Sequence, residues 1–356
     1  MIVMLESKSY IATPPGTTIK EQLAERSMTQ KEFASRMGFS EKHISHLLTG
    51  DVHLTPDVAE RLELVLGIPA RFWNKLETIY QEKRVKVKRE LEAEKEKKLV
   101  SMYPYNELAK LKILPLASKA VDKISNLCKF FEVSNLSFVQ KEDLTPIMCR
   151  KLSNNEKSTY TMLTLAQYAK KQARNIEIEP FQSDKLKHNL QNIRNFTTHS
   201  TVDFVSQLSD IFKECGIALV FLPQISGSFL HGISFYDQNT KKIVIGITMR
   251  GKYADRFWFS LFHELAHVIL GHIYGATEID DDDKEVAADA MASEILIPHK
   301  ELIKFKEQND FSIISIKRFA NSIGTSEGIV IGRLQNDRFI SYQMYNQYKI
   351  KFQDVL

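Results

Sequence analysis

The residues best suited to chemistry are two histidines and a glutamate in an otherwise apolar stretch. His263 and His267 are spaced as i and i+4, so a helix through this stretch would present both imidazoles on one face. Imidazole nitrogens are favoured ligands of Zn²⁺, and Glu264 beside them could hold and deprotonate the water of the metal. The H-E-x-x-H spacing therefore predicts the metal site of a zinc metalloprotease, with Glu264 as the catalytic base.

The third protein ligand has to come from another segment. The spacing of metzincins requires other residues at the positions of Leu270 and Ile273, which excludes that class. Glu285 and Asp289, again i and i+4, lie on a second expected helix that ends at Pro298. Small alanines on this helix permit a close approach to the first. We expect Glu285 to complete the zinc site and Asp289 to accept an imidazole N–H, which leaves the other nitrogen for the metal.

Other polar residues near the motif are weaker candidates for a role in catalysis or metal binding. His231, Tyr274 and His299 are candidate donors to the oxyanion of a peptidase reaction by type and nearness in sequence, and each is more readily explained as structural. His272 follows Gly271, and glycine commonly ends a helix. We interpret His272 as a helix-end histidine rather than as a ligand.

The composition bounds the class of protein. A chain of 356 residues, with 43% hydrophobic and 26% charged residues, is long enough for two or three domains with ordinary cores. The net charge of +4 is compatible with nucleic acid as a partner but does not require it. Three widely spaced cysteines argue against a disulfide framework and favour a reducing compartment. With neither a signal-peptide pattern nor a membrane-length apolar run, the sequence predicts a cytoplasmic protein without a membrane partner.

The N-terminal part of the chain has the marks of short, capped helices. Thr18 and Thr29 each stand three residues before a glutamate, which is the capping-box pattern. Gly38 and Gly50 are expected to end two successive helices. The stretch from Thr29 to Gly50 therefore predicts a helix, a tight turn and a second helix, packed together through apolar residues.

The polar side of this helix pair suits the edges of bases and the phosphates of double-stranded operator DNA. The predicted DNA contacts, at the start of the first helix and along the second, are Thr29, Gln30, Ser40, Glu41, Lys42, His43, Ser45, His46 and Thr49. The charge of the domain is nearly balanced, so the affinity is expected to depend on homodimerisation or on phosphate contacts from Lys20, Arg36 and Lys42. An amphipathic helical trio without DNA binding is the alternative.

The fold class expected for the chain is α+β and predominantly helical, with an N-terminal helix-turn-helix bundle, a helical middle region and a C-terminal zincin-like domain with a small sheet. The expected regions are a helix-turn-helix domain over 14–80, a charged helical linker over 81–100, the middle region over 101–215 and a metallopeptidase domain with a C-terminal helical extension over 216–356. Three strands are expected in the last region, at Ile217–Leu222, Gly232–Tyr236 and Lys242–Ile247, the last two as a hairpin. A sheet edge beside a metal helix suits an extended peptide, which adds as a further strand.

The chain as a whole resembles a family of bacterial and phage regulators in which a Cro/C1-type, HigA-antitoxin-like helix-turn-helix is fused to an ImmA/IrrE-type metallopeptidase. The resemblance is carried by Met28–Trp73, Arg250–His272, Glu285–Pro298 and Phe319–Gln335. Its most specific pieces are Phe257–Glu264, Glu285–Asp289, Leu296–Pro298 and Gly328–Gln335. It implies the same zinc ligands and the same base as the spacing does. It also implies a protein substrate, because family members without the fusion cut a partner repressor and relieve its block on stress or mobile-element genes.

The expected function is that of a DNA-binding transcriptional regulator with a zinc-dependent endopeptidase domain. The expected substrate is a repressor, a toxin-system partner or the chain itself, in a stress, toxin–antitoxin or mobile-element circuit. The alternative is a non-catalytic antitoxin or repressor, in which the metallopeptidase fold is a sensing or dimerisation module. A plain protease whose N-terminal helices bind protein is the third possibility.

Overall fold

The chain folds into two compact units, one within residues 1–100 and 117–125 and the other within residues 101–116 and 126–356. This computed structural model describes residues 5–139, 156–199, 204–225, 228, 230–248, 253–274 and 281–352. Among these residues, no helix is both long enough and apolar enough to span a bilayer.

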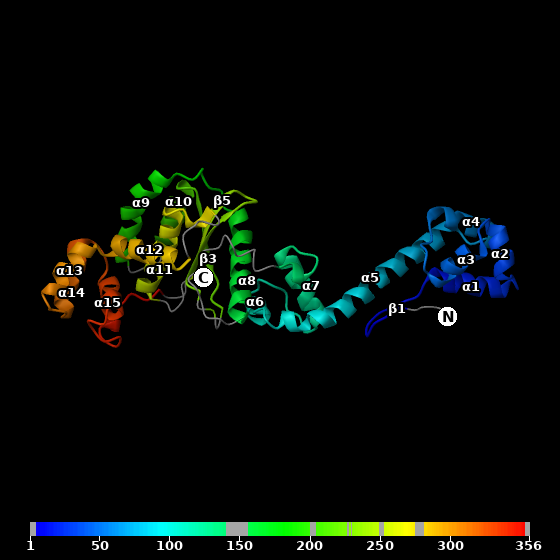
Figure 1. The fold of residues 1–356 in the computed structure, drawn as a ribbon, viewed down its shortest axis with the longest axis horizontal. Helices are drawn as coiled ribbons and strands as arrows, with labels where there is room; N and C mark the ends of the chain where they lie inside the picture. The colour runs from blue at the N-terminus through cyan, green and yellow to red at the C-terminus, as the bar shows by residue number, and fades with distance from the viewer. Residues whose placement is uncertain are drawn as a thin grey trace. The chain divides into compact units, whose positions relative to one another are not determined.

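The first unit is a bundle of short helices with an N-terminal hairpin. Its elements are β1 (Leu5–Glu6), β2 (Ile11–Ala12), α1 (Pro15–Glu25), α2 (Gln30–Met37), α3 (Glu41–Thr49), α4 (Pro56–Leu66) and α5 (Ala70–Val100), blue to cyan in Figure 1. Phe33 of α2, Ile44 of α3, Leu62 of α4 and Trp73 of α5 are fully buried in one core. The apolar sides of α2 and α3 therefore pack together as the sequence predicted.

Side-chain caps and glycines set the boundaries of the helix-turn-helix. Thr29 and Ser40 each accept a hydrogen bond from the backbone N–H three residues further on. Gly38 and Gly50 end α2 and α3 in the left-handed conformation, with φ of 71° and 82°. The predicted order of helix, tight turn and helix is confirmed.

The helix start predicted from the Thr18 capping box is wrong. The first helix, α1, begins at Pro15, and the preceding Pro14 makes no side-chain cap. A proline at the first helical position has a suitable φ and needs no partner for an N–H, so it starts the helix before Thr18. Thr18 therefore lies inside α1.

The predicted linker is the later part of one long helix. The helix α5 runs for 31 residues, and its early part belongs to the bundle, with Trp73 fully buried and Tyr80 5% exposed. Further along, Glu90 accepts hydrogen bonds from the hydroxyls of Ser7 and Ser9 in the N-terminal hairpin. The domain boundary expected after residue 80 thus falls within a helix that continues to Val100.

The second unit is built around a sheet that has three strands among the described residues. They are β3 (Ile217–Leu222), β4 (Gly232–Asp237) and β5 (Lys242–Thr248), in the order β3-β5-β4. The pair β3 and β5 is parallel, and β4 and β5 are antiparallel. All three strands occur where they were predicted, and β4 is an edge strand of the described sheet.

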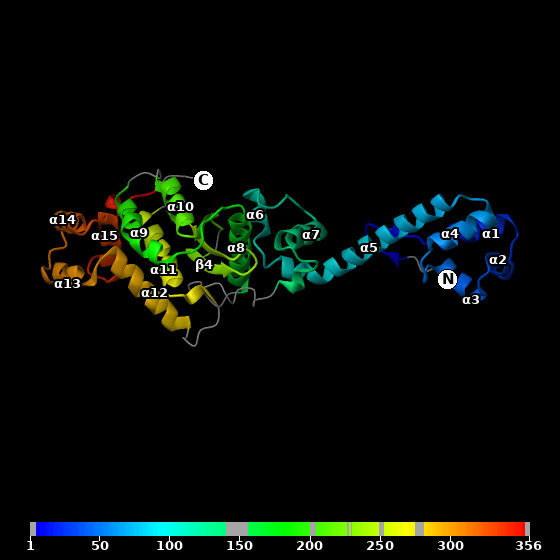
Figure 2. The ribbon, with the colours of Figure 1, turned by 90° about the horizontal axis from the view of Figure 1, so that it is seen from above.

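Helices cover both faces of this sheet, with α8 on one face and α10 and α11 on the other (Figure 2). The helices of this unit are α6 (Tyr105–Lys110), α7 (Ala120–Phe131), whose residues are shared between the two units, α8 (Glu156–Arg174), α9 (Ser183–Asn195), α10 (Phe204–Glu214), α11 (Ala254–Ile269), α12 (Asp281–Leu296), α13 (His299–Glu307), α14 (Ile313–Ile323) and α15 (Glu327–Asn336), with 3-10 turns η1 (Leu136–Phe138), η3 (Phe196–Thr198), η5 (His272–Tyr274) and η6 (Asn346–Tyr348). On the α11 side, Ile217, Ile243 and Ile245 share one core with Trp258 and Phe262. Alternate residues of β3 and β5 thus pack against α11.

The middle region contributes helices to this same unit. Both α8 and α10 pack on β3. Lys242 at the start of β5 donates hydrogen bonds to the carbonyls of Ala173, Arg174 and Ile176, at and just beyond the end of α8, with distances of 3.1, 3.3 and 2.6 Å. The unit that contains α11 therefore extends well before residue 216.

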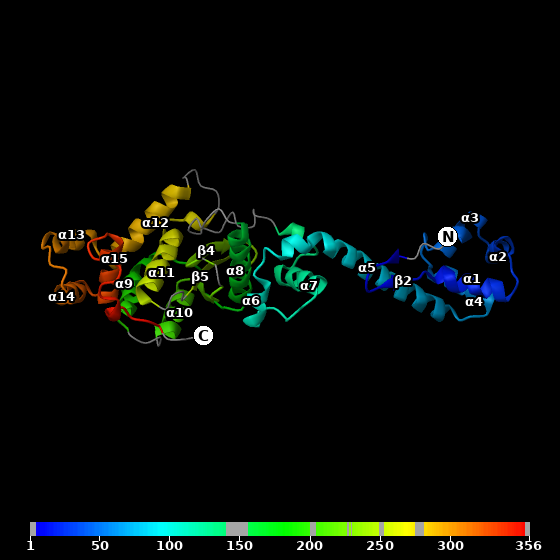
Figure 3. The same ribbon diagram turned by 90° about the horizontal axis from the view of Figure 1, so that it is seen from below.

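Among the C-terminal helices, α15 packs on α11 and α14 packs on α15 (Figure 3). The helix α15 packs on α11, and a Cβ added at Gly332 would lie 2.6 Å from the Asp255 Oδ2 atom. Lys349 Nζ lies 2.7 Å from the same oxygen, and both side chains of this ion pair are less than 10% exposed. The glycine and the buried ion pair hold the first turn of α11 in place.

Candidate functional site

Two histidines project from the buried side of α11. Every residue from Leu261 to Val268 is buried, with His263 4% exposed and His267 fully buried. Their Nε2 atoms lie 3.0 Å apart. Burying polar side chains costs free energy unless they have partners or bind a ligand. The burial of these two histidines therefore needs a physical explanation.

Glu285 of α12 reaches both imidazoles. Its Oε2 atom lies 3.3 Å from His263 Nε2, and its Oε1 atom lies 3.4 Å from His267 Nε2. The helices α11 and α12 lie side by side (Figures 1 and 2). Ala288 and Ala292, on the same side of α12 as Glu285, are fully buried, and their small side chains allow the close approach. The three residues predicted as ligands are thus brought together.

This donor set fits a zinc ion. With metal–nitrogen bonds of about 2.0–2.1 Å, neighbouring ligand atoms of a tetrahedral site are roughly 3.3 Å apart. The corresponding separations among His263, His267 and Glu285 are 3.0, 3.3 and 3.4 Å. Two imidazoles and a carboxylate also match the chemistry of zinc sites that keep a fourth position for water or substrate.

Each histidine has its own partner for the Nδ1 atom. His263 Nδ1 lies 2.8 Å from the Asp289 Oδ1 atom, the contact predicted for Asp289. His267 Nδ1 lies 3.0 Å from His272 Nδ1. His272 is 5% exposed and contacts a proposed ligand, a role that its interpretation as a helix-end histidine missed. The sequence signal was Gly271, whose φ of 75° turns the next residue back towards α11.

The charges of this cluster shift its pKa values. Burial lowers the pKa of His263, but hydrogen bonds with Asp289 and Glu285 outweigh it and raise the pKa to about 9. Burial alone would raise the pKa of Glu285, whereas its contacts with His263 and His267 lower it to about 2. At neutral pH, the metal-free cluster therefore pairs a protonated His263 with an ionised Glu285.

Glu264 lies next to the cluster and faces β4. The side chain is 2% exposed, and a Cβ added at Gly232 would lie 2.6 Å from its Cγ atom. A hollow of about 10 Å³, the scale of one water molecule, opens beside it. The residues that line the hollow are His231, Gly232, Phe259, Ser260, His263 and Glu264. A water molecule and a carboxylate can therefore meet at the edge strand.

The three candidate oxyanion donors lie in different places. His231 lines the hollow beside Glu264. Tyr274 is 50% exposed and its ring lies against that of Tyr236. His299 is exposed at the start of α13, where its backbone N–H donates to Glu294. Of these three, His231 is the residue positioned near the chemistry.

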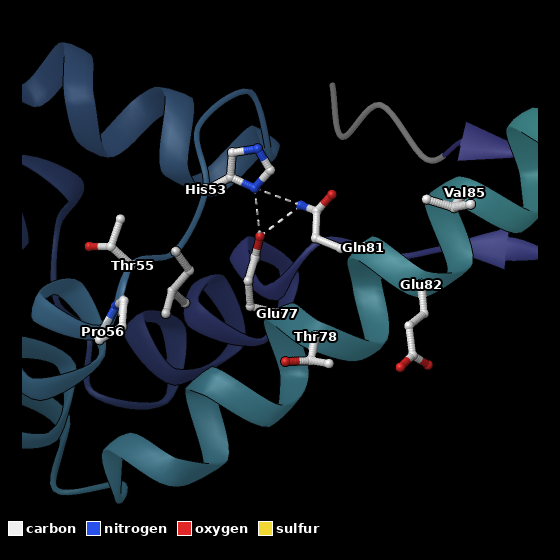
Figure 4. A pocket seen from close by; sticks show the side chains of 9 residues that line it. His53, Thr55, Pro56, Glu77, Thr78, Gln81, Glu82 and Val85 are labelled. Carbon is white, nitrogen blue, oxygen red and sulfur yellow. Dashed lines mark hydrogen bonds and ion pairs between the residues drawn. The ribbon is translucent and has the colours of Figure 1, made fainter.

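A larger hollow, of about 610 Å³, lies in the first unit between the loop before α4 and the helix α5 (Figure 4). Its surface is mostly apolar. Its polar groups bind one another: Gln81 donates to Glu77 Oε1 at 2.7 Å, and His53 Nδ1 lies 3.2 Å from the same oxygen. The larger hollow is not the better candidate for the reactive site, because its polar side chains already hydrogen-bond to one another. Among the described residues, no cluster of metal-ligand side chains adjoins it.

The predicted DNA contacts differ in how accessible they are. Gln30, Glu41, Lys42 and Ser45 are exposed, and the last three share one side of α3. Of the three residues considered for phosphate contact, Lys42 is exposed and Arg36 is paired with Glu32 at 2.6 Å. The exposed part of the pair is therefore the start of α2 and the outer side of α3.

The remaining predicted contacts have structural partners. Thr29 and Ser40 use their hydroxyls as helix caps. The ring of His43 lies 4.5 Å from that of Phe39. His46 and Thr49 bond to Asp51 at 3.2 and 2.6 Å, and these bonds, that of Thr49 first, lower the pKa of the Asp51 carboxyl. Thr29 therefore fixes the start of α2, and the other four residues make contacts at the two ends of α3.

Comparison with known proteins assigns both units. Residues 19–73 match the helix-turn-helix family, and residues 219–335 match the IrrE N-terminal-like domain of the Peptidase_M78 family. The uncharacterized HTH-type transcriptional regulator YddM of Escherichia coli strain K12 is 37% identical over 79 residues, which are 21% of this chain and 84% of that protein. The chain therefore belongs to the helix-turn-helix transcriptional regulators and carries a Peptidase_M78 domain. The predicted resemblance and fold class are confirmed.

Zinc uptake should release a proton from His263. The Nε2 atom can bind a metal only after its proton has left. Because the pKa of His263 is raised to about 9, this proton is still present at neutral pH. We expect about one proton per zinc at pH 7.5, and an affinity that falls roughly tenfold for each pH unit below about 9. Titration calorimetry in buffers of different ionisation enthalpy measures the release. The variant Asp289→Asn should release fewer protons per zinc than the parent protein. Equal proton release by the variant and the parent would contradict the role given to His263 and Asp289.

Replacing Lys42 should weaken DNA binding in a salt-dependent way. Loss of one phosphate contact should lower the affinity of Lys42→Ala for all duplexes and reduce the slope against log salt by about one. Fluorescence anisotropy with duplexes from upstream of its own gene measures both quantities. Lys75→Ala, which removes an exposed charge from α5, is the matched control and should bind as the parent does. Equal losses in the two variants would show that α3 has no special role.

Proposed function

We propose that the chain is a transcriptional regulator that binds operator DNA through α2 and α3 and cuts a protein with a zinc-dependent endopeptidase domain. The observation that carries the peptidase proposal is the buried cluster of His263, His267 and Glu285 with Glu264 at its side. Among substrates we include a repressor, a toxin-system partner and the chain itself, in the cytoplasm. A homodimer would place two copies of α3 on two half-sites of the operator.

The residues of the cluster divide the chemistry between them. His263, His267 and Glu285 would hold the zinc ion, with Asp289 accepting the Nδ1 proton of His263. When bound, zinc supplies Lewis-acid activation of a water molecule and of the scissile carbonyl. Glu264 takes the proton of the attacking water and passes it to the leaving amine. Its low exposure, 2%, limits exchange of that proton with bulk water.

The edge strand β4 is the expected binding place for the substrate backbone. Gly232 at its start lies against Glu264, and β4 pairs with β5 along one of its two edges. An extended peptide added to β4 as a further strand would carry its scissile bond past Glu264. The hollow of about 10 Å³ holds no more than about one water molecule, so a peptide must lie across its opening. An extended segment, such as a loop, linker or unfolded region, fits this geometry.

The alternative is a non-catalytic antitoxin or repressor that uses the fold for sensing or dimerisation. The observation in its favour is the near-complete burial of the cluster, with His263, Glu264 and His267 all less than 5% exposed. Such a site can bind zinc and stabilise the fold without admitting a peptide. Zinc content does not separate the two functions, whereas removal of the proposed base does.

The variant Glu264→Gln should keep zinc and lose cleavage. The amide preserves the shape of the side chain but accepts no proton, so we expect the rate to fall by at least about a hundredfold. The assay co-expresses the chain with the products of adjacent genes and follows these products and the chain itself by intact mass. Glu294→Gln, at an exposed site on α12, is the control and should cleave normally.

The outcomes of this assay discriminate between the functions. Equal cleavage by the parent and by Glu264→Gln would show that Glu264 is not the catalytic base. If neither protein cleaves anything while both bind zinc and repress the promoter, the sensing alternative replaces the peptidase.

A further inference from the structure

We propose that His272 is a positioning residue that fixes the tautomer and ring orientation of the ligand His267. The inference rests on the proposed metal centre and adds a residue to it. His272 lies outside the ligand cluster and outside the H-E-x-x-H motif. Its Nδ1 atom lies 3.0 Å from His267 Nδ1, and neither ring is more than 5% exposed.

The direction of this hydrogen bond follows from the chemistry of two imidazoles. A contact between two nitrogens needs a donor on one side and a lone pair on the other. If the Nε2 atom of His267 binds a metal, the only proton of that ring is on Nδ1. His272 must then accept with its own Nδ1 lone pair and carry its proton on Nε2. His272 thus does for His267 what Asp289 does for His263.

The backbone is shaped to deliver this contact. In a continuing α-helix, a residue five positions after His267 would point about 140° away around the axis. Instead α11 ends at Ile269, Gly271 adopts φ of 75°, and η5 turns His272 back towards the metal face. No atom lies within 4 Å of a Cβ added at Gly271, so its left-handed φ and not crowding requires glycine.

Charge explains why a neutral acceptor is suitable at this place. The site already contains three carboxylates, Glu264, Glu285 and Asp289, around one proposed divalent ion. The Asp289 side chain is 38% exposed, so part of its charge is solvated. His272 is 5% exposed, and a fourth carboxylate there would be a buried anion without solvent. A neutral imidazole accepts the N–H of His267 without adding charge.

A packing role is the competing explanation, because the rings of His267 and His272 also make a T-shaped contact with centroids 5.2 Å apart. The two roles make opposite predictions for two variants. His272→Phe keeps the ring and removes the acceptor. His272→Asn removes the ring but places an amide oxygen near the former Nδ1 position.

The test is zinc affinity of the full-length chain, measured by competition with a chromophoric chelator. We expect His272→Phe to bind zinc about 10- to 100-fold more weakly and His272→Asn to stay within roughly threefold of the parent. Thermal midpoints in excess chelator show whether each variant folds without metal. In zinc-loaded parent protein, ¹H–¹⁵N correlation spectra should show the Nε2–H tautomer of His272, a readout that needs no variant.

Several results would overturn the inference. They are equal zinc affinity of all three proteins, weak binding by His272→Asn alone, and a proton on Nδ1 of His272. In each case the parent still binds zinc, so the proposed metal centre survives. If the parent takes up no zinc, the metal centre fails and the role of His272 fails with it.

Discussion

The contact between two imidazoles of α11 and one carboxylate of α12 is the interaction on which the second unit depends. It places His263, His267 and Glu285 within bonding range of a common point, and the surrounding fold serves that placement. Fully buried alanines bring α12 close to α11, the sheet supports α11 from below, and Gly332 with the Lys349–Asp255 pair holds its start. Polar side chains are costly to bury without partners or a ligand, and this cluster has the donor set that a metal ion would use.

Local signals in the sequence were sufficient for much of the fold. The strands β3, β4 and β5 and the cap at Thr29 could be predicted because short apolar runs and capping patterns are properties of a few neighbouring residues. The shared face of His263 and His267 could be predicted because the i and i+4 spacing fixes a helix face whatever the fold. The Thr18 prediction was wrong because a competing local signal, Pro15 at the first helical position, starts the helix earlier.

The features that were missed depend on how the folded chain orients particular side chains. The early part of α5 is tied to the bundle by Trp73 and Tyr80, which a pattern of alternating charges does not reveal. The contact of His272 with His267 depends on the φ of Gly271, and sequence marks the turn but not the direction in which the next side chain points. Likewise, part of the polar face of α3 contacts Asp51 and Phe39, which only the folded structure shows.

The account is tested most directly by the coordination of zinc in the purified chain. X-ray absorption at the zinc edge, on protein loaded with one equivalent of the metal, reports the type and distance of the ligand atoms. The account predicts two imidazole nitrogens and a carboxylate oxygen at about 2.0–2.2 Å, with one nitrogen lost in each of His263→Ala and His267→Ala. A shell containing sulfur, or one that is unchanged in Glu285→Ala and in both histidine variants, would contradict it.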